Sequence, residues 1–416
     1  MNLLKEVLEE IKPDEELKTE VSGKIYSVLS ALKKKVKEAK VILGGSGAKG
    51  TWLKRANDAD IFVCFKYSKY KDKSDQLSGI LEKKLKKIFP RITKLHGSRD
   101  YFQLKKGNFT FEIVPILDIK DAKQAVNITD VSPLHAKWVA ANTNKALKDE
   151  IRLTKQFCKA NNAYGAESYI RGFSGYICEV LTTHYGSFLK LARNAAKWPD
   201  KVIIDIKKYY KGKDVLQELN KSKAYSPLIL IDPVQHDRNA AAALSKEKFD
   251  NFRLACKNFL KKPSKELFKE KVLTTDDLKK KAKNKKLIAL DIKTIRRKED
   301  IAGAKLVKSF EYMADKLLRN DFKILEKGWH WDKELKATIF FICDKKPLPN
   351  IKLHEGPALK QKFHVKRFKA KHKNTFTKGK KVFAKVKREF TKPEDLVKKL
   401  IKEPYIKEKV KQIRLL

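Results

Sequence analysis

A glycine-serine turn and a pair of aspartates stand close together in the first part of the chain. The turn is Gly45-Ser46, and the aspartates are Asp58 and Asp60. Glycine lets the backbone approach a ligand closely, and a serine hydroxyl followed by helix amides can bind phosphate oxygens. Side chains at i and i+2 of a β-strand point to the same face, so Asp58 and Asp60 can share a divalent cation. The two motifs together indicate metal-assisted phosphoryl or nucleotidyl transfer.

Two further residues extend this site. Lys49 stands one helical turn after Ser46, where its charge could neutralise a bound triphosphate. Glu112 is the only acid in the alternating segment 109–115, and a lone acid in such a strand is costly to bury without a partner. We therefore expect Glu112 to be a third metal ligand, although an edge-strand glutamate in solvent is the alternative. Asp118 and Asp121 are expected to cap the segment that follows.

Composition points to a folded protein with a polyanionic partner. Hydrophobic residues make up 42% of the 416 residues, and the formal net charge is +46. Such an imbalance favours nucleic acid as the partner; an anionic membrane is the competing interpretation, but no anchor segment, spanning segment or signal peptide supports it. The five cysteines show neither zinc-site nor Cys-x-x-Cys spacing, which is typical of reduced thiols and predicts a cytoplasmic protein.

Hydrophobic periodicity predicts an α+β chain of three parts. Residues 1–135 should form a mixed sheet with helices around the acidic site. Their expected elements are a helix at 18–38, a strand at 41–43, a helix at 47–53, a strand from 60, and two or three strands within 91–117. Residues 136–275 should be helical. Residues 276–416, after a basic stretch at 279–286, should hold a strand at 287–292, a helix at 302–318 and strands at 322–324 and 337–343.

The segment 360–388 carries thirteen lysines and arginines and no acid, and four phenylalanines punctuate it. Such a face is suited to contact a phosphate backbone without reading bases. A lysine-rich helix in solvent is an equally simple interpretation of this segment.

The motifs resemble the catalytic head of polymerase-β-type nucleotidyltransferases, and more narrowly the archaeal-type (class I) CCA-adding enzymes. The head motifs are Gly-Ser-x-x-Lys-Gly-Thr-Trp-Leu, Asp-x-Asp-Ile-Phe-Val and Glu-Ile-Val-Pro. The likeness is strong over about residues 40 to 260 and looser beyond. It continues through these segments: 132–135, 149–155, 163–167, 170–176, 184–188 and 232–239.

The resemblance implies a role for each matching residue. Asp58, Asp60 and Glu112 would bind Mg²⁺. The contacts to the incoming ATP or CTP would come from Gly45, Ser46, Lys49, His135, Lys155 and Tyr164, with Arg238 in the pocket that selects the nucleotide. The family's third metal ligand is usually aspartate and its cradle cation usually arginine. Glu112 and Lys49 therefore depart from the family pattern, and Lys49 lacks the bidentate fork of arginine.

The resemblance also implies the reaction and the partners. A catalytic head (1–135), a helical neck (136–275) and a body with a basic tail (276–416) would add C, C and A to the 3′ end of tRNA from CTP and ATP, without a template and with release of pyrophosphate. The body and its basic tail would together hold the acceptor arm. Alternatives are a poly(A) polymerase or an oligoadenylate synthetase-like enzyme, and a non-catalytic RNA-binding protein. The oligomeric state stays open, with a homodimer as one option.

Overall fold

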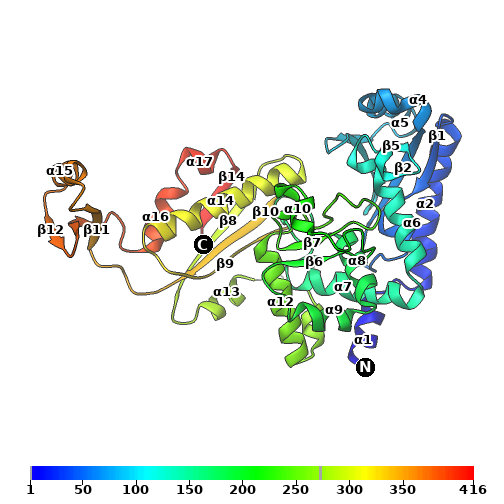
Figure 1. The fold of residues 1–416 in the computed structure, drawn as a ribbon. Coiled ribbons are helices and arrows are strands. Elements are labelled where there is room, and N and C mark those ends of the chain that lie inside the picture. Colours follow the sequence, from blue (N-terminus) through cyan, green and yellow to red (C-terminus); the bar gives the residue numbers. More distant parts are fainter. Residues whose placement is uncertain (1, 271–273) are drawn as a thin grey trace. The chain divides into compact units, whose positions relative to one another are not determined.

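The computed structural model describes residues 2–270 and 274–416 of the chain, drawn in Figure 1. The chain divides into two compact units, Met1–Lys271 and Val272–Leu416, and each is described by itself. The predicted division of the first unit between residues 135 and 136 stays a prediction.

A five-stranded mixed sheet carries the acidic residues of the first unit. Its order is β1-β2-β5-β4-β3. The bounds are β1 Ala39–Leu43, β2 Asp58–Lys66, β3 Thr93–Leu95, β4 Tyr101–Lys106 and β5 Phe109–Asp118. The two central strands, β2 and β5, run parallel, and the other neighbours pair antiparallel. The expected strands are confirmed, and β4 and β5 form a hairpin.

The two faces of this sheet have different surroundings. Helix α2 (Glu15–Lys35) and helix α5 (Leu77–Ile88) cover one face and share a core with Ile61 and Ile113. On the other face a smaller apolar cluster joins Phe62 and Cys64 of β2 to Val114 and Ile116 of β5. Because strand residues alternate between faces, Asp58, Asp60 and Glu112 belong to this second face.

The helix after the glycine turn differs from the expectation of 47–53. Helix α3 spans Gly45–Lys49. It begins directly after the extended Gly44, and the residue that caps its end, Gly50, has a φ of 67°. This left-handed glycine stops the helix and turns the chain toward β2. Asp121 caps a short 3₁₀ turn as expected, whereas Asp118 is the last residue of β5 and not a cap.

Helices dominate the rest of the first unit. The long ones are α1 Asn2–Ile11, α6 Ser132–Asn142, α7 Lys145–Ala160, α8 Gly175–Tyr185, α9 Phe188–Ala195 and α12 Lys246–Lys261. Phenylalanines at 157, 173, 188, 249 and 252 fill their common core. A two-stranded parallel sheet, β6 (Val202–Ile204) and β7 (Leu228–Leu230), interrupts the helices and was not predicted. The short elements are α4 Tyr67–Tyr70, η1 Lys71–Gln76, η2 Ala122–Gln124, η3 Ile128–Val131, α10 Val215–Glu218, α11 Lys221–Ala224 and η4 Lys265–Phe268.

The second unit contains a four-stranded antiparallel sheet of order β14-β8-β10-β9. Helix α14 (Glu299–Arg319) packs on it through one buried stripe that includes Leu306, Met313 and Leu317. The remaining bounds are α13 Thr275–Ala282, β8 Lys286–Thr294, β9 Ile324–Trp331, β10 Lys336–Cys343, α16 Pro393–Leu400, α17 Pro404–Lys407 and β14 Val410–Leu415. The strand expected at 322–324 begins only at Ile324. The basic stretch 279–286 forms the end of α13 and the start of β8.

The basic segment belongs to a small module of its own. Strands β11 (Ile351–Ala358), β13 (Lys381–Lys387) and β12 (Thr375–Lys378) form an antiparallel sheet in that order. Helix α15 (Lys362–Lys371) contacts β11. The alternative interpretation of residues 360–388 as a lysine-rich helix in solvent therefore applies only to α15, since strands β12 and β13 form much of the rest.

No helix within residues 2–270 and 274–416 combines the length and the apolar character that crossing a membrane requires. The five cysteines are buried free thiols.

Candidate active site

The parallel pairing of β2 with β5 brings the three predicted metal ligands together on one face. Asp60 lies opposite Glu112 in the register, and Asp58 lies opposite Thr110. Asp58 is exposed, while Asp60 and Glu112 are half-buried. The face thus presents three carboxylates, two at the start of β2 and one in the first half of β5. Their oxygens are the hard ligands that Mg²⁺ prefers.

The glycine turn lies directly against this acidic face. The backbone N–H of Gly44 donates to the carbonyl oxygen of Asp60 over 2.8 Å. Gly45 has a φ of +54°, and a Cβ added to it would lie 1.7 Å from Oδ2 of Asp60. Only glycine therefore leaves room for the Asp60 carboxylate beside the turn. The following residue, Ser46, is half-buried on α3 and comes immediately after this close approach.

Burial and charge repulsion act on Asp60. Removal from water, followed by the negative charge of Asp58, raises the pKa of Asp60 to about 6, and Lys49 opposes this rise. Among the described residues, no three His, Cys, Asp or Glu side chains converge closely enough to form a ready-made metal centre. Mutually repelling carboxylates on one face are nevertheless the donor set that a divalent cation would draw together.

Lys49 and Lys155 meet at a buried carboxylate, that of Glu179 on α8. Lys49 Nζ donates to Glu179 Oε2 over 2.8 Å, and Lys155 Nζ donates to Oε1 over 2.8 Å. The hydroxyl of Thr51 donates to the same Oε1 over 2.7 Å. Glu179 is 1% exposed, yet the two lysines hold its pKa at about 2, against the effect of burial. The site therefore contains two amines neutralised in part by one carboxylate.

His135 and Arg238 meet at a second buried carboxylate, that of Asp232. His135 Nε2 lies 2.9 Å from Asp232 Oδ2, and Arg238 Nη1 donates to the same oxygen. Tyr176 donates its hydroxyl to Asp232 Oδ1 over 2.9 Å, and its ring stacks on His135 with 4.1 Å between centroids. Burial alone would raise the pKa of Asp232, but His135 and Arg238 lower it to about 2.

Tyr176 connects the two carboxylate clusters. Lys49 Nζ lies 5.4 Å from the centroid of its ring, within cation–π range. Tyr164 is less closely tied to them: it is half-buried, pairs with Phe173 in an isolated β-bridge, and has Lys159 over its ring. Burial and nearby acidic groups raise the pKa of the Tyr164 hydroxyl.

Arg152 joins the helices to the glycine turn. Its guanidinium donates to the carbonyl oxygens of Gly50 over 2.6 Å and of Trp52 over 3.0 Å, and it pairs with Asp149 on its own helix. Helix α7 therefore holds the loop that follows α3, and with it the position of Lys49.

Sequence reasoning did not assign Glu179, Asp232 or Thr51 to the site. Glu179 carried a readable signal, since it is the only charged residue in the run 175–182. A lone acid on an apolar helix needs a buried partner, which is the same argument that selected Glu112. Asp232 and Thr51 were each recognised within a motif, but neither was given a role.

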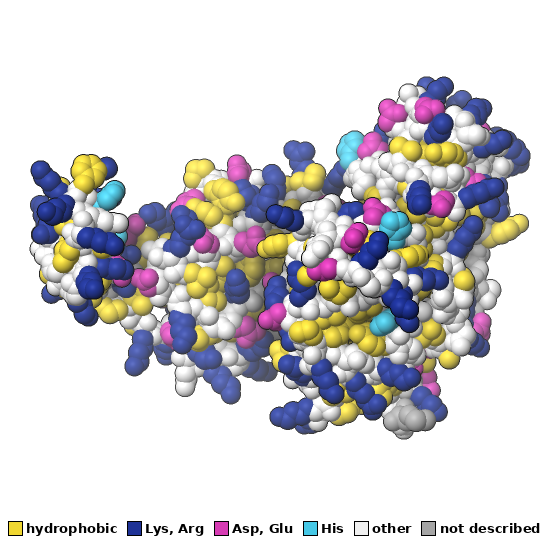
Figure 2. All heavy atoms as spheres, in the orientation of Figure 1, with side chains coloured by type: hydrophobic (Ala, Val, Ile, Leu, Met, Phe, Trp, Pro, Cys, Tyr) yellow, Lys and Arg dark blue, Asp and Glu magenta, His cyan; other side chains and the backbone are white. Residues whose placement is uncertain are grey.

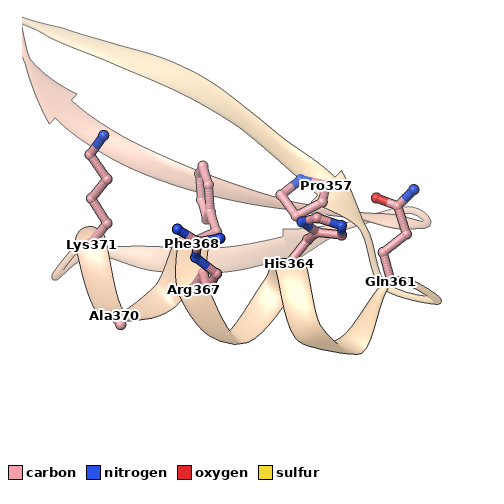
Figure 3. Close-up of a pocket in the computed structure, with 7 residues that line it drawn as sticks. All are labelled: Pro357, Gln361, His364, Arg367, Phe368, Ala370 and Lys371. Carbon is pink, nitrogen blue, oxygen red and sulfur yellow. The ribbon is translucent and has the colours of Figure 1, made fainter.

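The module of β11, β12, β13 and α15 presents a basic surface. On the face drawn in Figure 2, Lys and Arg side chains crowd over this module. Figure 3 shows the groove between α15 and β11, toward which Phe368 and Lys371 rise from the helix. Its volume is about 710 Å³, and it is lined by Pro357, Gln361, His364, Arg367, Phe368, Ala370 and Lys371. Phe363 is 68% exposed, and the guanidinium of Arg367 lies 5.8 Å from its ring centroid. Exposed aromatic rings beside cations are suited to nucleic acid.

Three family models match successive parts of the chain. Residues 25–125 match the nucleotidyltransferase domain, residues 149–269 the second domain of tRNA nucleotidyltransferase, and residues 283–411 the C-terminal domain of the CCA-adding enzyme. Together the matched segments include every residue placed in the two carboxylate clusters except His135.

Relatives and solved structures agree with these matches. A CCA-adding enzyme of Methanocaldococcus jannaschii is 32% identical over 409 residues, which cover 96% of this chain and 90% of that protein. A CCA-adding enzyme of Nanoarchaeum equitans is 39% identical over 307 residues, covering 73% of this chain and 74% of that protein. A Cid1 poly(U) polymerase structure aligns with a TM-score of 0.52 at 16% identity over 65% of this chain and 98% of its own, which shows a shared fold. The predicted α+β fold with a polymerase-β-like head is confirmed. The chain belongs to the CCA-adding enzymes, the nucleotidyltransferases that complete the 3′ end of tRNA.

Proposed function

We propose that Asp58, Asp60 and Glu112 hold Mg²⁺ for nucleotide transfer to the tRNA 3′ end. The main support for this proposal is the register of β2 with β5, because it puts all three carboxylates on the face beside the glycine turn. Bound there, the metal would lower the pKa of the attacking 3′-hydroxyl and stabilise the leaving pyrophosphate. The raised pKa of Asp60 supports the assignment, because a site built for a cation is electrostatically unfavourable without one.

The incoming CTP or ATP would lie between the turn and the two carboxylate clusters. Gly45 and Ser46 would receive phosphate oxygens, and Lys49 and Lys155 would offset their charge. His135 would contact the triphosphate, with Tyr164 closing the pocket and Arg238 available to the base. Support comes from the convergence of these cations, since Tyr176 contacts both Lys49 and His135.

The basic module would hold the acceptor arm of the tRNA. Its lysines and arginines suit the phosphates of an A-form helix, and the rings around its groove suit unpaired or terminal bases. We further propose that this one chain adds both C and A, and that the same pair of clusters, around Glu179 and Asp232, receives either triphosphate.

Nucleotide incorporation into tRNA that lacks its 3′ end tests this function directly. With CTP alone we expect two additions, with ATP alone none, and with both the stepwise sequence C, C, A. Long A tails would contradict the proposal, and addition of only C or only A would contradict the single-chain form of it. Asp60→Ala should abolish addition; activity retained by this variant would refute the metal assignment.

A further inference from the structure

Glu179 is a buried carboxylate that three donors share. The donors come from separate parts of the chain: Lys49 lies on α3, Thr51 in the loop after it, and Lys155 on α7. Glu179 itself lies on α8, so its carboxylate links that helix both to α7 and to the residues that follow the glycine turn.

The contacts fix each amine separately. One carboxylate oxygen receives Lys49, and the other receives both Lys155 and Thr51. The Thr51 hydroxyl also accepts a hydrogen bond from Lys155 over 2.9 Å. Charge-assisted bonds of this kind restrict long side chains that otherwise rotate freely. Two amines with the same charge can lie this close together only because a carboxylate stands between them.

We propose that Glu179 is a positioning residue for nucleotide binding: it holds the amines of Lys49 and Lys155 together so that the triphosphate meets two cations already in place. This inference rests on the proposed triphosphate contacts of both lysines. The net charge of the trio remains positive, so the carboxylate orders the cations without cancelling their attraction for a phosphate. Without it, the two amines repel each other and lose their common position.

Glu179→Gln tests the proposal, with Kd for CTP and for ATP measured by isothermal titration calorimetry. The amide keeps the size of the side chain but cannot accept strongly from both amines. We expect Kd to rise on the order of tenfold, the effect of one charge-assisted hydrogen bond, and by the same factor for both nucleotides because the triphosphate is common to them. An unchanged or lower Kd would overturn the proposal, as would a change for one nucleotide only.

Lys155→Met separates this inference from the function on which it rests. If Lys155→Met leaves Kd unchanged, the proposed triphosphate contact of Lys155 is wrong. If it raises Kd while Glu179→Gln does not, only the positioning role is wrong. If the triphosphate contact of Lys155 and the positioning role of Glu179 are both correct, each variant alone raises Kd. Glu179→Gln should then raise Kd less in the Lys155→Met background, because one of the two amines is already absent.

Thr51→Val provides a milder variant in case Glu179→Gln does not fold. It removes the hydroxyl that links Lys155 to Glu179, and we expect Kd to rise about threefold for both nucleotides. Thr182→Val is the matched control: Thr182 is equally buried on α8, and its hydroxyl bonds to Thr154 and Cys178 outside the cluster. A loss of thermal stability without a change of Kd in Thr51→Val would show a purely structural role and overturn the proposal.

Discussion

Gly45 is the position at which one methyl group tests the geometry of the acidic face. In Gly45→Ala the new Cβ would lie 1.7 Å from Oδ2 of Asp60, whereas an ordinary carbon–oxygen contact is about 3.3 Å. The carboxylate or the turn must therefore shift by roughly 1.5 Å. The φ of +54° adds a second penalty, because a left-handed conformation costs a residue with a Cβ about 1 kcal/mol.

The displacement decides the size of the effect on catalysis. A misplacement of about 1 Å in a reacting group can reduce a rate on the order of 100-fold, so we expect kcat of Gly45→Ala to fall by at least that factor. The loss of stability should stay near 1 to 2 kcal/mol, since either the exposed side of the turn or the Asp60 side chain can yield.

Two nearby glycines, one within α3 and one at its end, serve as controls. At Gly47 a Cβ would make only ordinary contacts with Leu43, at 3.4 Å, so Gly47→Ala should keep full activity. Gly50 shares the positive φ, at +67°, but its Cβ would meet only Lys148 at 3.7 Å. Gly50→Ala thus reports backbone strain without the clash. Single-turnover incorporation of CMP into tRNA, together with thermal unfolding, compares the three variants.

The reasoning fails if folded Gly45→Ala retains kcat within threefold of the unsubstituted protein. It also fails if Gly50→Ala loses as much activity as Gly45→Ala, because strain and not the position of Asp60 would then explain the loss.

Three other expectations concern buried carboxylates and the basic module. Because the pKa of Asp60 is raised to about 6, the metal-free protein loses stability as pH rises through 6. Asp60→Asn should therefore raise the free energy of unfolding in EDTA at pH 7.5 by up to about 3 kcal/mol, with a higher melting temperature, and give no gain at pH 3; a decrease at pH 7.5 would contradict this. The pKa of Asp232 is lowered to about 2, so its stabilisation is present above pH 4 and lost as pH falls toward 2. Asp232→Asn should cost about 3 kcal/mol in urea unfolding at pH 7, against little change for exposed Asp237→Asn. Arg367→Ala should weaken tRNA binding and reduce its salt slope by about one, while KM for CTP stays unchanged; filter binding at several salt concentrations measures the slope.

The acidic strands were predictable because their side chains alternate and their acids interrupt apolar runs. The spacing alone did not reveal that Asp60 pairs opposite Glu112, because a long connection that contains α4, η1, α5, β3 and β4 separates β2 from β5. Parallel pairing is set by tertiary packing and not by a local turn. The lone-acid argument, repeated by the family resemblance, named Glu112 as the expected third ligand, but neither showed which residue of β2 lies opposite it.

The anchors of the cations were harder to see. Lys49 and Lys155 were predicted to contact the nucleotide, but nothing in their own surroundings pointed to Glu179, because the three residues converge only after α3, α7 and α8 pack together. The sheet of β6 and β7 was missed for a different reason: strands of three residues leave too short an alternation to distinguish from a helix or loop.

The bonds from Arg152 to the carbonyl oxygens of Gly50 and Trp52 bear on how such enzymes can be recombined. A backbone carbonyl offers the same acceptor whatever side chain it carries, so this link tolerates sequence drift in the loop but not a change of its path. The side-chain pairs of Lys49 and Thr51 with Glu179, by contrast, require matched residues from both sides. A chimera that joins the first 135 residues of one relative to the remainder of another should therefore keep its shape, but should keep its affinity for nucleotides only where the residues of these pairs match across the junction.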